Sequence, residues 1–136
     1  MTGTTPYLLF PGNAAEAMEF YRDLFGGELE MHSYADFGRG DGPGDAIAHA
    51  TLEGPVRLFG SDAGPDEDAL HMSGMFLALL GAADPAALRR WFETLAATGR
   101  VLDPLQDRPW GASDGQVVDR YGVRWLIGYE AEAEES

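Results

Sequence analysis

Residues 10–27, FPGNAAEAMEFYRDLFGG, carry the clearest structural signal in the chain. Apolar side chains recur there with the spacing of one helical face, at Ala17, Phe20, Tyr21, Leu24 and Phe25. Asn13 stands where a helix N-cap is expected, and Gly26-Gly27 is a typical helix end. The stretch therefore predicts an amphipathic helix between Asn13 and Gly26.

The same spacing returns 71 residues later, at Leu88, Trp91, Phe92, Leu95 and Ala96. Asp84, followed by Pro85, is the N-cap candidate of this second helix, and Gly99 lies near its end. The interval is about half of the 136-residue chain, which indicates an internal duplication. The chain is therefore interpreted as two equivalent halves.

Short apolar runs precede both helices, at residues 7–10 and 75–80, and segments of strand character follow them. These later strands are expected at residues 28–34, 46–52 and 56–60, and again at 100–102, 116–119 and 123–129. The order predicts an α+β fold of two βαβββ modules. We expect one domain over residues 1–136, with module 1 at about 5–62, module 2 at about 72–130 and an acidic tail at 131–136.

Composition narrows the classes of partner. The chain has 23 acidic and 9 basic residues and a formal charge of −14, which disfavours nucleic acid and anionic membranes as partners. It contains no cysteine, so thiolate nucleophiles and thiolate metal sites are excluded. Neither a signal peptide nor a long apolar span is recognisable, and a cytoplasmic location is the expectation.

Two stretches resemble a known family. Residues 10–27 are similar to the opening of PhnB-like proteins, which belong to the glyoxalase, bleomycin-resistance and extradiol-dioxygenase (vicinal-oxygen-chelate) superfamily. A second similarity runs from Trp110-Gly111 through Gly115, Val117, Asp119 and Tyr121-Gly122 to Trp125. With His49-Ala50 and Ser61-Asp62, the resemblance spans nearly the whole chain.

The resemblance implies a cup-shaped, mostly antiparallel eight-stranded sheet with the helices on its outer face and a ligand on its inner face. Members of the superfamily include metal-dependent isomerases, lyases and dioxygenases, and also metal-free proteins that sequester a drug. Some relatives carry a methyltransferase label. A Rossmann-type methyl-donor domain needs a longer βαβ array, so that activity is not expected here.

Metal-using members place one His, Glu or Gln ligand on each of the first, fourth, fifth and eighth strands. The matching positions here fall at Pro6, Arg57 and Leu126, and the fifth strand offers only His71 near its start. An arginine has no lone pair to donate and repels a divalent cation. No metal site and no cofactor are therefore expected.

The ligand pocket is expected on the inner sheet face, lined by Leu8, Phe10, Arg57, Phe59 and Leu126, with His49 and Trp110 at its rim. Apolar walls and one fixed positive charge favour a flat or apolar molecule with an anionic or carbonyl group. His49 has the alternative of a purely structural role, and Trp110 that of a plug at the edge of the cup. Trp125 is expected to pack under a helix as core.

The predicted function is metal-independent binding of a small molecule, with a homodimer expected by analogy with relatives. Two alternatives stay open from the sequence. The first is an enzyme of the same superfamily, either metal-dependent with displaced ligands or metal-free through His49. The second is an interaction protein that binds no small molecule.

Overall fold

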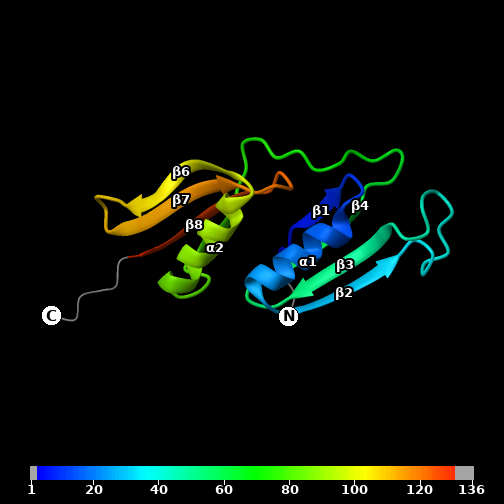
Figure 1. Cartoon of the computed structure of the whole chain (residues 1–136), viewed down its shortest axis with the longest axis horizontal. Coiled ribbons are helices and arrows are strands. Elements are labelled where there is room, and N and C mark those ends of the chain that lie inside the picture. The colour runs from blue at the N-terminus through cyan, green and yellow to red at the C-terminus, as the bar shows by residue number, and fades with distance from the viewer. Residues whose placement is uncertain (1–2, 131–136) are drawn as a thin grey trace. The chain divides into compact units, whose positions relative to one another are not determined.

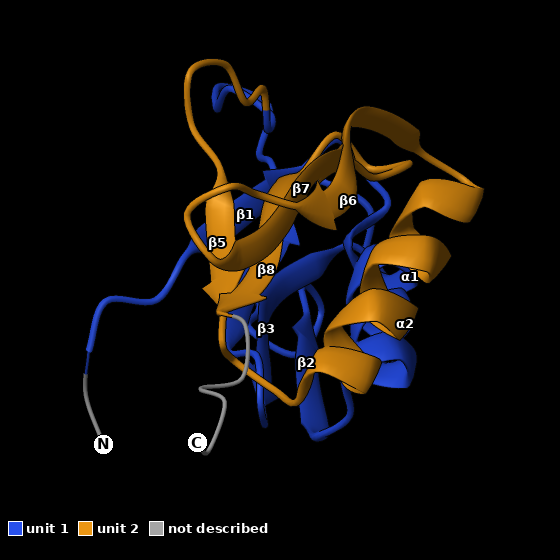
Figure 2. Ribbon diagram, turned by 90° about the vertical axis from the view of Figure 1, so that its left-hand side faces the viewer, with its two compact units in different colours: residues 1–70 blue, residues 71–136 orange. Residues whose placement is uncertain are grey.

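A computed structural model of the chain describes residues 3–130, and the acidic tail expected at 131–136 lies outside the described residues. The chain divides into two compact units, residues 1–70 and 71–136 (Figure 2). Each unit contains one helix and four strands in the order βαβββ, so the α+β class and the two modules are confirmed. Among residues 3–130 there is no helix of the length and apolarity needed to cross a membrane.

Unit 1 consists of β1 (Tyr7–Phe10), α1 (Ala14–Phe25), β2 (Glu28–Ser33), β3 (Ile47–Glu53) and β4 (Leu58–Asp62). Its sheet has the order β1-β4-β3-β2, with a parallel β1–β4 pair and antiparallel pairs elsewhere. Helix α1 packs against β2, β3 and β4 (Figure 1). The other sheet face, which α1 does not cover, is called the open face of unit 1 below.

Unit 2 repeats this plan with β5 (Leu77–Leu80), α2 (Pro85–Ala97), β6 (Arg100–Asp107), β7 (Ala112–Val118) and β8 (Arg124–Glu130). Its sheet has the order β5-β8-β7-β6, again with one parallel pair. The eight strands thus form two four-stranded mixed sheets, one in each unit. Within its own unit, β1 pairs with β4 and β5 pairs with β8.

Both helices bury an apolar stripe, but the stripe of α1 is rotated from the expected one. Its buried residues are Ala14, Ala17, Met18, Tyr21 and Phe25, whereas Phe20 and Leu24 are half-buried. In α2 the expected Leu88, Trp91, Phe92 and Leu95 are all buried, and Ala96 is half-buried. Trp125 is completely buried, which confirms its place in the core.

The two helix N-termini are capped differently. Asp84 caps α2 as expected, because its Oδ1 accepts a hydrogen bond from the Ala87 amide at 2.8 Å. Asn13 occupies the N-cap position of α1 but makes no side-chain cap bond there. The Ala14 amide donates instead to Asp62 Oδ1 at the end of β4, at 2.9 Å. Asn13 is therefore not the capping side chain that the local sequence indicates.

In each unit a buried carboxylate, Asp62 in unit 1 and Asp119 in unit 2, accepts hydrogen bonds from several neighbouring segments. Asp62 also accepts from the Ile47 amide at 2.8 Å, so it joins α1, β3 and β4. Asp119, in the turn between β7 and β8, accepts from the Tyr121 and Val123 amides and from Trp125 Nε1 at 2.8, 3.0 and 3.0 Å. Buried carboxylates with full sets of N–H donors are structural anchors.

Candidate functional site

The open face of unit 1 carries three neighbouring rings, from Tyr7 on β1, His49 on β3 and Phe59 on β4, of which Tyr7 and His49 are stacked and Phe59 is tilted against both. The Tyr7 and His49 ring centroids lie 5.5 Å apart with planes inclined by 30°. Phe59 lies 6.1 Å from Tyr7 and 5.8 Å from His49. These three residues are called the ring cluster below.

The ring cluster forms because of strand pairing and alternation. Tyr7 is in register with Phe59, and Phe59 with Thr51, two residues along β3 from His49. Successive side chains on a strand point to opposite faces, so the neighbours Leu8, Ala50 and Leu58 turn toward α1 and are buried. The ring cluster is thereby left on the open face.

The Tyr7 hydroxyl fixes the chemistry of His49. Its Oη lies 2.9 Å from His49 Nδ1. A phenol is a good donor, so we infer that the hydroxyl donates to an unprotonated Nδ1. In that tautomer the imidazole carries its proton on Nε2.

Arg57 brings a positive charge to the same cluster. Its guanidinium carbon lies 5.5 Å from the centroid of Phe59, and its Nη2 lies 3.0 Å from Glu53 Oε1. The arginine side chain is 35% exposed and that of Glu53 55%, so water screens this ion pair. Glu53 therefore competes for Arg57 with any anion that approaches.

The structure does not bring all the expected pocket residues together. His49 and Arg57 each lie close to Phe59 in unit 1. Leu8 and Phe10 are buried instead, and a Cβ at Gly60 would meet both the Phe10 ring and Met18 of α1 at 3.1 Å. Phe10 thus lies on the helix-covered face. Leu126 and Trp110 belong to unit 2, and Leu126 pairs with Gln116 and Ala78 in its sheet.

Tyr7 was not among the expected site residues. It follows Pro6, the position matched to a metal ligand, and it is 46% exposed. Alternation along β1 groups Leu8 with Phe10 and leaves Tyr7 on the other face, but it does not tell which of the two faces α1 covers. The hydrogen bond to His49 joins residues 42 positions apart, and no local pattern indicates it.

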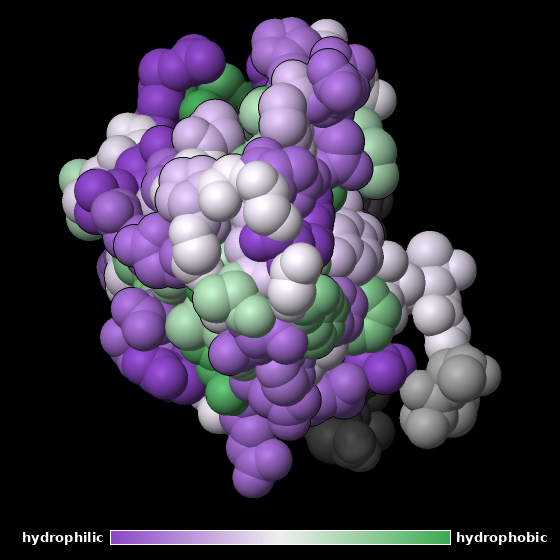
Figure 3. Space-filling view, turned by 90° about the vertical axis from the view of Figure 1, so that its right-hand side faces the viewer, coloured by the Kyte–Doolittle hydropathy of each residue, from purple (hydrophilic) through white to green (hydrophobic). Residues whose placement is uncertain are grey.

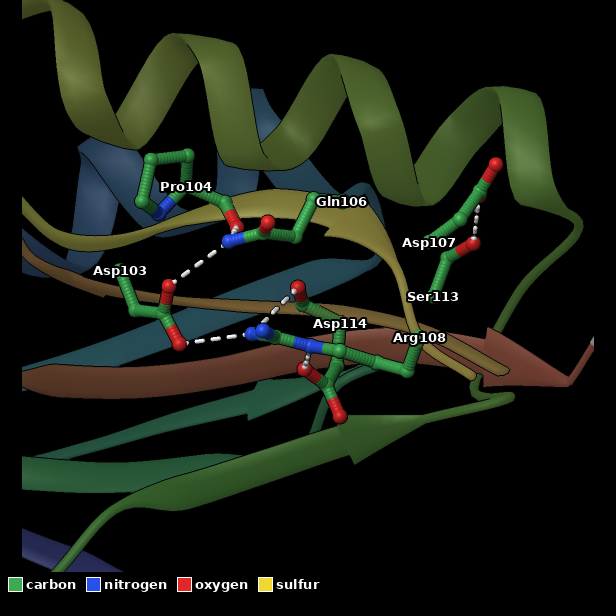
Figure 4. A network of polar contacts seen from close by, with 7 residues as sticks. All are labelled: Asp103, Pro104, Gln106, Asp107, Arg108, Ser113 and Asp114. Carbon is green, nitrogen blue, oxygen red and sulfur yellow. Dashed lines mark hydrogen bonds and ion pairs between the residues drawn. The ribbon is translucent and has the colours of Figure 1, made fainter. Parts of the chain in front are cut away.

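Trp110 lies at the tip of the β6–β7 hairpin and is 71% exposed. The hairpin is held near its tip by Arg108, whose Nε donates to Asp114 at 2.7 Å and whose Nη2 donates to Asp103 at 2.6 Å (Figure 4). Those two carboxylates, Asp114 first, raise the pKa of Arg108 above its ordinary value. The guanidinium therefore stays charged and joins Asp103 on β6 to Asp114 on β7.

Clusters of side chains that could bind a metal ion are absent from the described part of the chain. Residues 3–130 contain no group of three or more His, Cys, Asp or Glu side chains placed to hold a metal ion. Figure 3 shows one side of the molecule, which is largely hydrophilic with small apolar patches, as expected for a chain of charge −14. The ring cluster with Arg57 is a candidate site because it combines an aromatic surface with a positive charge. A separate cavity of about 560 Å³ in unit 1 is lined by Gly12, Asn13, Tyr34, Asp45 and Asp62.

Comparison with known proteins agrees with this architecture. Residues 4–127 match the model of the Glyoxalase/Bleomycin resistance protein/Dioxygenase superfamily. Protein YjdN of Escherichia coli K12 is 34% identical, over 90% of this chain and 92% of that protein. The crystal structure of PA1353 from Pseudomonas aeruginosa is 34% identical, with a TM-score of 0.79, and covers 97% of this chain and 100% of that one.

A PhnB protein from Bacillus cereus, described as a putative 3-demethylubiquinone-9 3-methyltransferase, is also similar. It is 26% identical with a TM-score of 0.76, over 94% of this chain and 99% of that one. These similarities extend over both βαβββ units. The similarity to a PhnB protein confirms the family resemblance seen in residues 10–27.

Proposed function

Because the chain belongs to the glyoxalase/bleomycin resistance protein/dioxygenase superfamily, we propose that it binds a small molecule without a metal, on the open face of unit 1. The observation that carries the proposal is the Tyr7–His49 hydrogen bond beside Phe59. It sets an N–H donor next to an aromatic surface. That combination suits a flat ligand with a carbonyl or carboxylate group.

Metal independence is proposed from the chemistry of the side chains at the site. Tyr7 lies on β1 and Phe59 on β4, the strands from which unit 1 would supply its ligands, and Arg57 directly precedes β4. A guanidinium donates hydrogen bonds but no lone pair, and it opposes a nearby cation. His49 alone is a good metal donor in the cluster, and its Nδ1 is engaged by Tyr7.

Arg57 gives the proposed site its preference for anions. A carboxylate on the ligand would take the place of Glu53 in front of the guanidinium, while the flat body lies on Phe59 and Tyr7. The methyltransferase name of the Bacillus cereus relative is not extended to this chain. Both sheets here contain antiparallel pairs, unlike the parallel sheet of a Rossmann methyl-donor domain.

The ion pair offers a matched set of variants. We expect Arg57→Met to weaken binding of 2-naphthoate by about tenfold, because one charge-assisted hydrogen bond is lost. Glu53→Gln should tighten 2-naphthoate by about threefold, because it removes the competing carboxylate. Isothermal titration calorimetry on both variants measures this, with neutral 2-naphthylmethanol as the control ligand.

The double variant, with both substitutions, separates loss of the cation from exposure of an unpaired Glu53. It should bind 2-naphthoate and 2-naphthylmethanol with similar affinity. If Arg57→Met distinguishes the two ligands as strongly as the parent does, the guanidinium does not face the ligand and the site is misassigned.

We also propose a homodimer in the cytoplasm. The support is analogy with the family and the prevalence of two-fold symmetric oligomers. Sedimentation equilibrium at micromolar concentration should then give twice the 14.7 kDa chain mass, and a single-chain mass would refute the dimer. Fractionation of the source cells, followed by immunoblotting, tests the location.

A further inference from the structure

Unit 2 has a cavity of its own, apart from the site proposed in unit 1. It has a volume of about 540 Å³ and lies where β5 and β8 end, beside the β6–β7 hairpin. Its apolar lining includes Trp110, Leu80 and the ring of Tyr129, and its charged lining consists of Asp114 and Glu130. It is called the hairpin cavity below.

An indole is presented to this cavity in a defined position. The hairpin tip is closed by hydrogen bonds from the Arg108 amide to the Ala112 carbonyl at 2.7 Å and from the Gly111 amide to the Arg108 carbonyl at 3.1 Å. Gly111 has a φ of +89°, a conformation that favours glycine. Trp110 lies between Arg108 and Gly111 in this loop and is 71% exposed, and Leu80, which lines the same cavity, is 58% exposed. Two large apolar side chains next to one concavity mark a binding surface.

The charge around the hairpin cavity is negative. Asp114 and Glu130 are the charged residues of the lining, and because Arg108 pairs with Asp114, Glu130 supplies the negative charge of the rim. Arg89 contacts Tyr129, since its Nη1 donates to the Tyr129 hydroxyl at 3.0 Å and its guanidinium carbon lies 5.8 Å from the ring centroid. An anion would be repelled from this rim, whereas a cation is attracted to it.

We propose that the hairpin cavity binds an organic cation, such as a quaternary ammonium group, against the face of Trp110. The indole is the best aromatic surface for a cation, and a weakly hydrated alkylammonium loses little on leaving water. Leu80 and the Tyr129 ring receive the alkyl groups, and Glu130 supplies the opposite charge. This ligand class is distinct from the flat anion proposed for unit 1, so the two proposals stand or fall separately.

Choline and 3,3-dimethylbutan-1-ol test the proposal, because they have the same shape and differ only in charge. Each is titrated into ¹⁵N-labelled full-length protein at constant ionic strength, and the three indole N–H resonances are followed by NMR. The Trp110 resonance is the one that disappears in Trp110→Leu. Choline should shift it saturably in the millimolar range, with the neutral alcohol at least about fivefold weaker.

Variants give the second arm of the test. Trp110→Leu should weaken choline binding, observed by saturation transfer to its methyl groups, by about fivefold or more. Glu130→Gln should weaken it by about threefold, and Arg57→Met, in unit 1, should leave it unchanged. Unchanged Trp91 and Trp125 resonances show that each variant is folded. Equal affinity for choline and the alcohol, or unaltered choline binding by Trp110→Leu, would overturn the proposal.

Discussion

Replacing Asp119 with alanine is expected to lower the free energy of unfolding by about 3–5 kcal/mol, because three N–H donors lose a shared charged acceptor. The carboxylate is 4% exposed and accepts from the Tyr121 amide, the Val123 amide and Trp125 Nε1. Water cannot easily replace it around a fully buried indole. Urea unfolding followed by circular dichroism measures the loss.

Asp66→Ala is the control for Asp119→Ala, since Asp66 is exposed in the segment between β4 and β5 and should cost less than about 0.5 kcal/mol. The loss in free energy of unfolding for Asp119→Asn should lie between those of Asp66→Ala and Asp119→Ala. The asparagine amide keeps one acceptor oxygen but turns an NH₂ group toward other donors. A loss below about 1 kcal/mol for Asp119→Ala would show that the turn rearranges to satisfy these groups without the carboxylate.

The second large effect is expected at Asp62. Its side chain caps α1 through Ala14 and holds the first amide of β3 through Ile47, and it is 6% exposed. Asp62→Ala should therefore lower the free energy of unfolding by about 2–4 kcal/mol, with the N-terminal turn of α1 losing its protection first. Hydrogen exchange of the α1 amides, together with urea unfolding, measures both parts.

Asp84→Ala is the matched control for Asp62→Ala, because it removes the equivalent cap from α2. Asp84 is exposed and accepts one amide bond, so its loss should cost about 1 kcal/mol. Equal costs at the two positions would mean that Asp62 acts only as a helix cap and does not join β3 to the helix.

The helices were predictable because their signals are local. The spacing of Leu88, Trp91 and Phe92 marks the buried side of α2, and Asp84 with Pro85 marks its start. Apolar runs and turn residues placed β1 at its observed bounds. They displaced β4, expected at 56–60 and observed at Leu58–Asp62, and β7, expected at 116–119 and observed at Ala112–Val118. The strand β6 was expected to be shorter than it is, because Pro104 interrupts its pattern and irregular pairing on both sides of Asp103 accommodates it.

Long-range features were not predictable from the sequence. Alternation tells which residues of β1 share a face, but it does not tell which face α1 covers. Leu8 and Phe10 were therefore assigned to the wrong side, and Tyr7 was overlooked. Asp62 displaces Asn13 as the cap of α1 although 48 residues separate it from Ala14. Hydrogen bonds between residues so far apart in the sequence depend on the topology of the sheet, and no local motif predicts them.

Contact between His49, held by Tyr7, and a flat anionic ligand without a metal is observed directly in a long-range ¹H–¹⁵N NMR spectrum of the histidine rings. The spectrum is recorded on EDTA-dialysed protein during titration with 2-naphthoate. We predict that His49 starts as the Nε2–H tautomer and that its Nε2 resonance shifts saturably, while those of His32 and His71 stay in place. A His49 signal unmoved by 2-naphthoate, or one that moves only after a divalent metal is restored, would contradict the account.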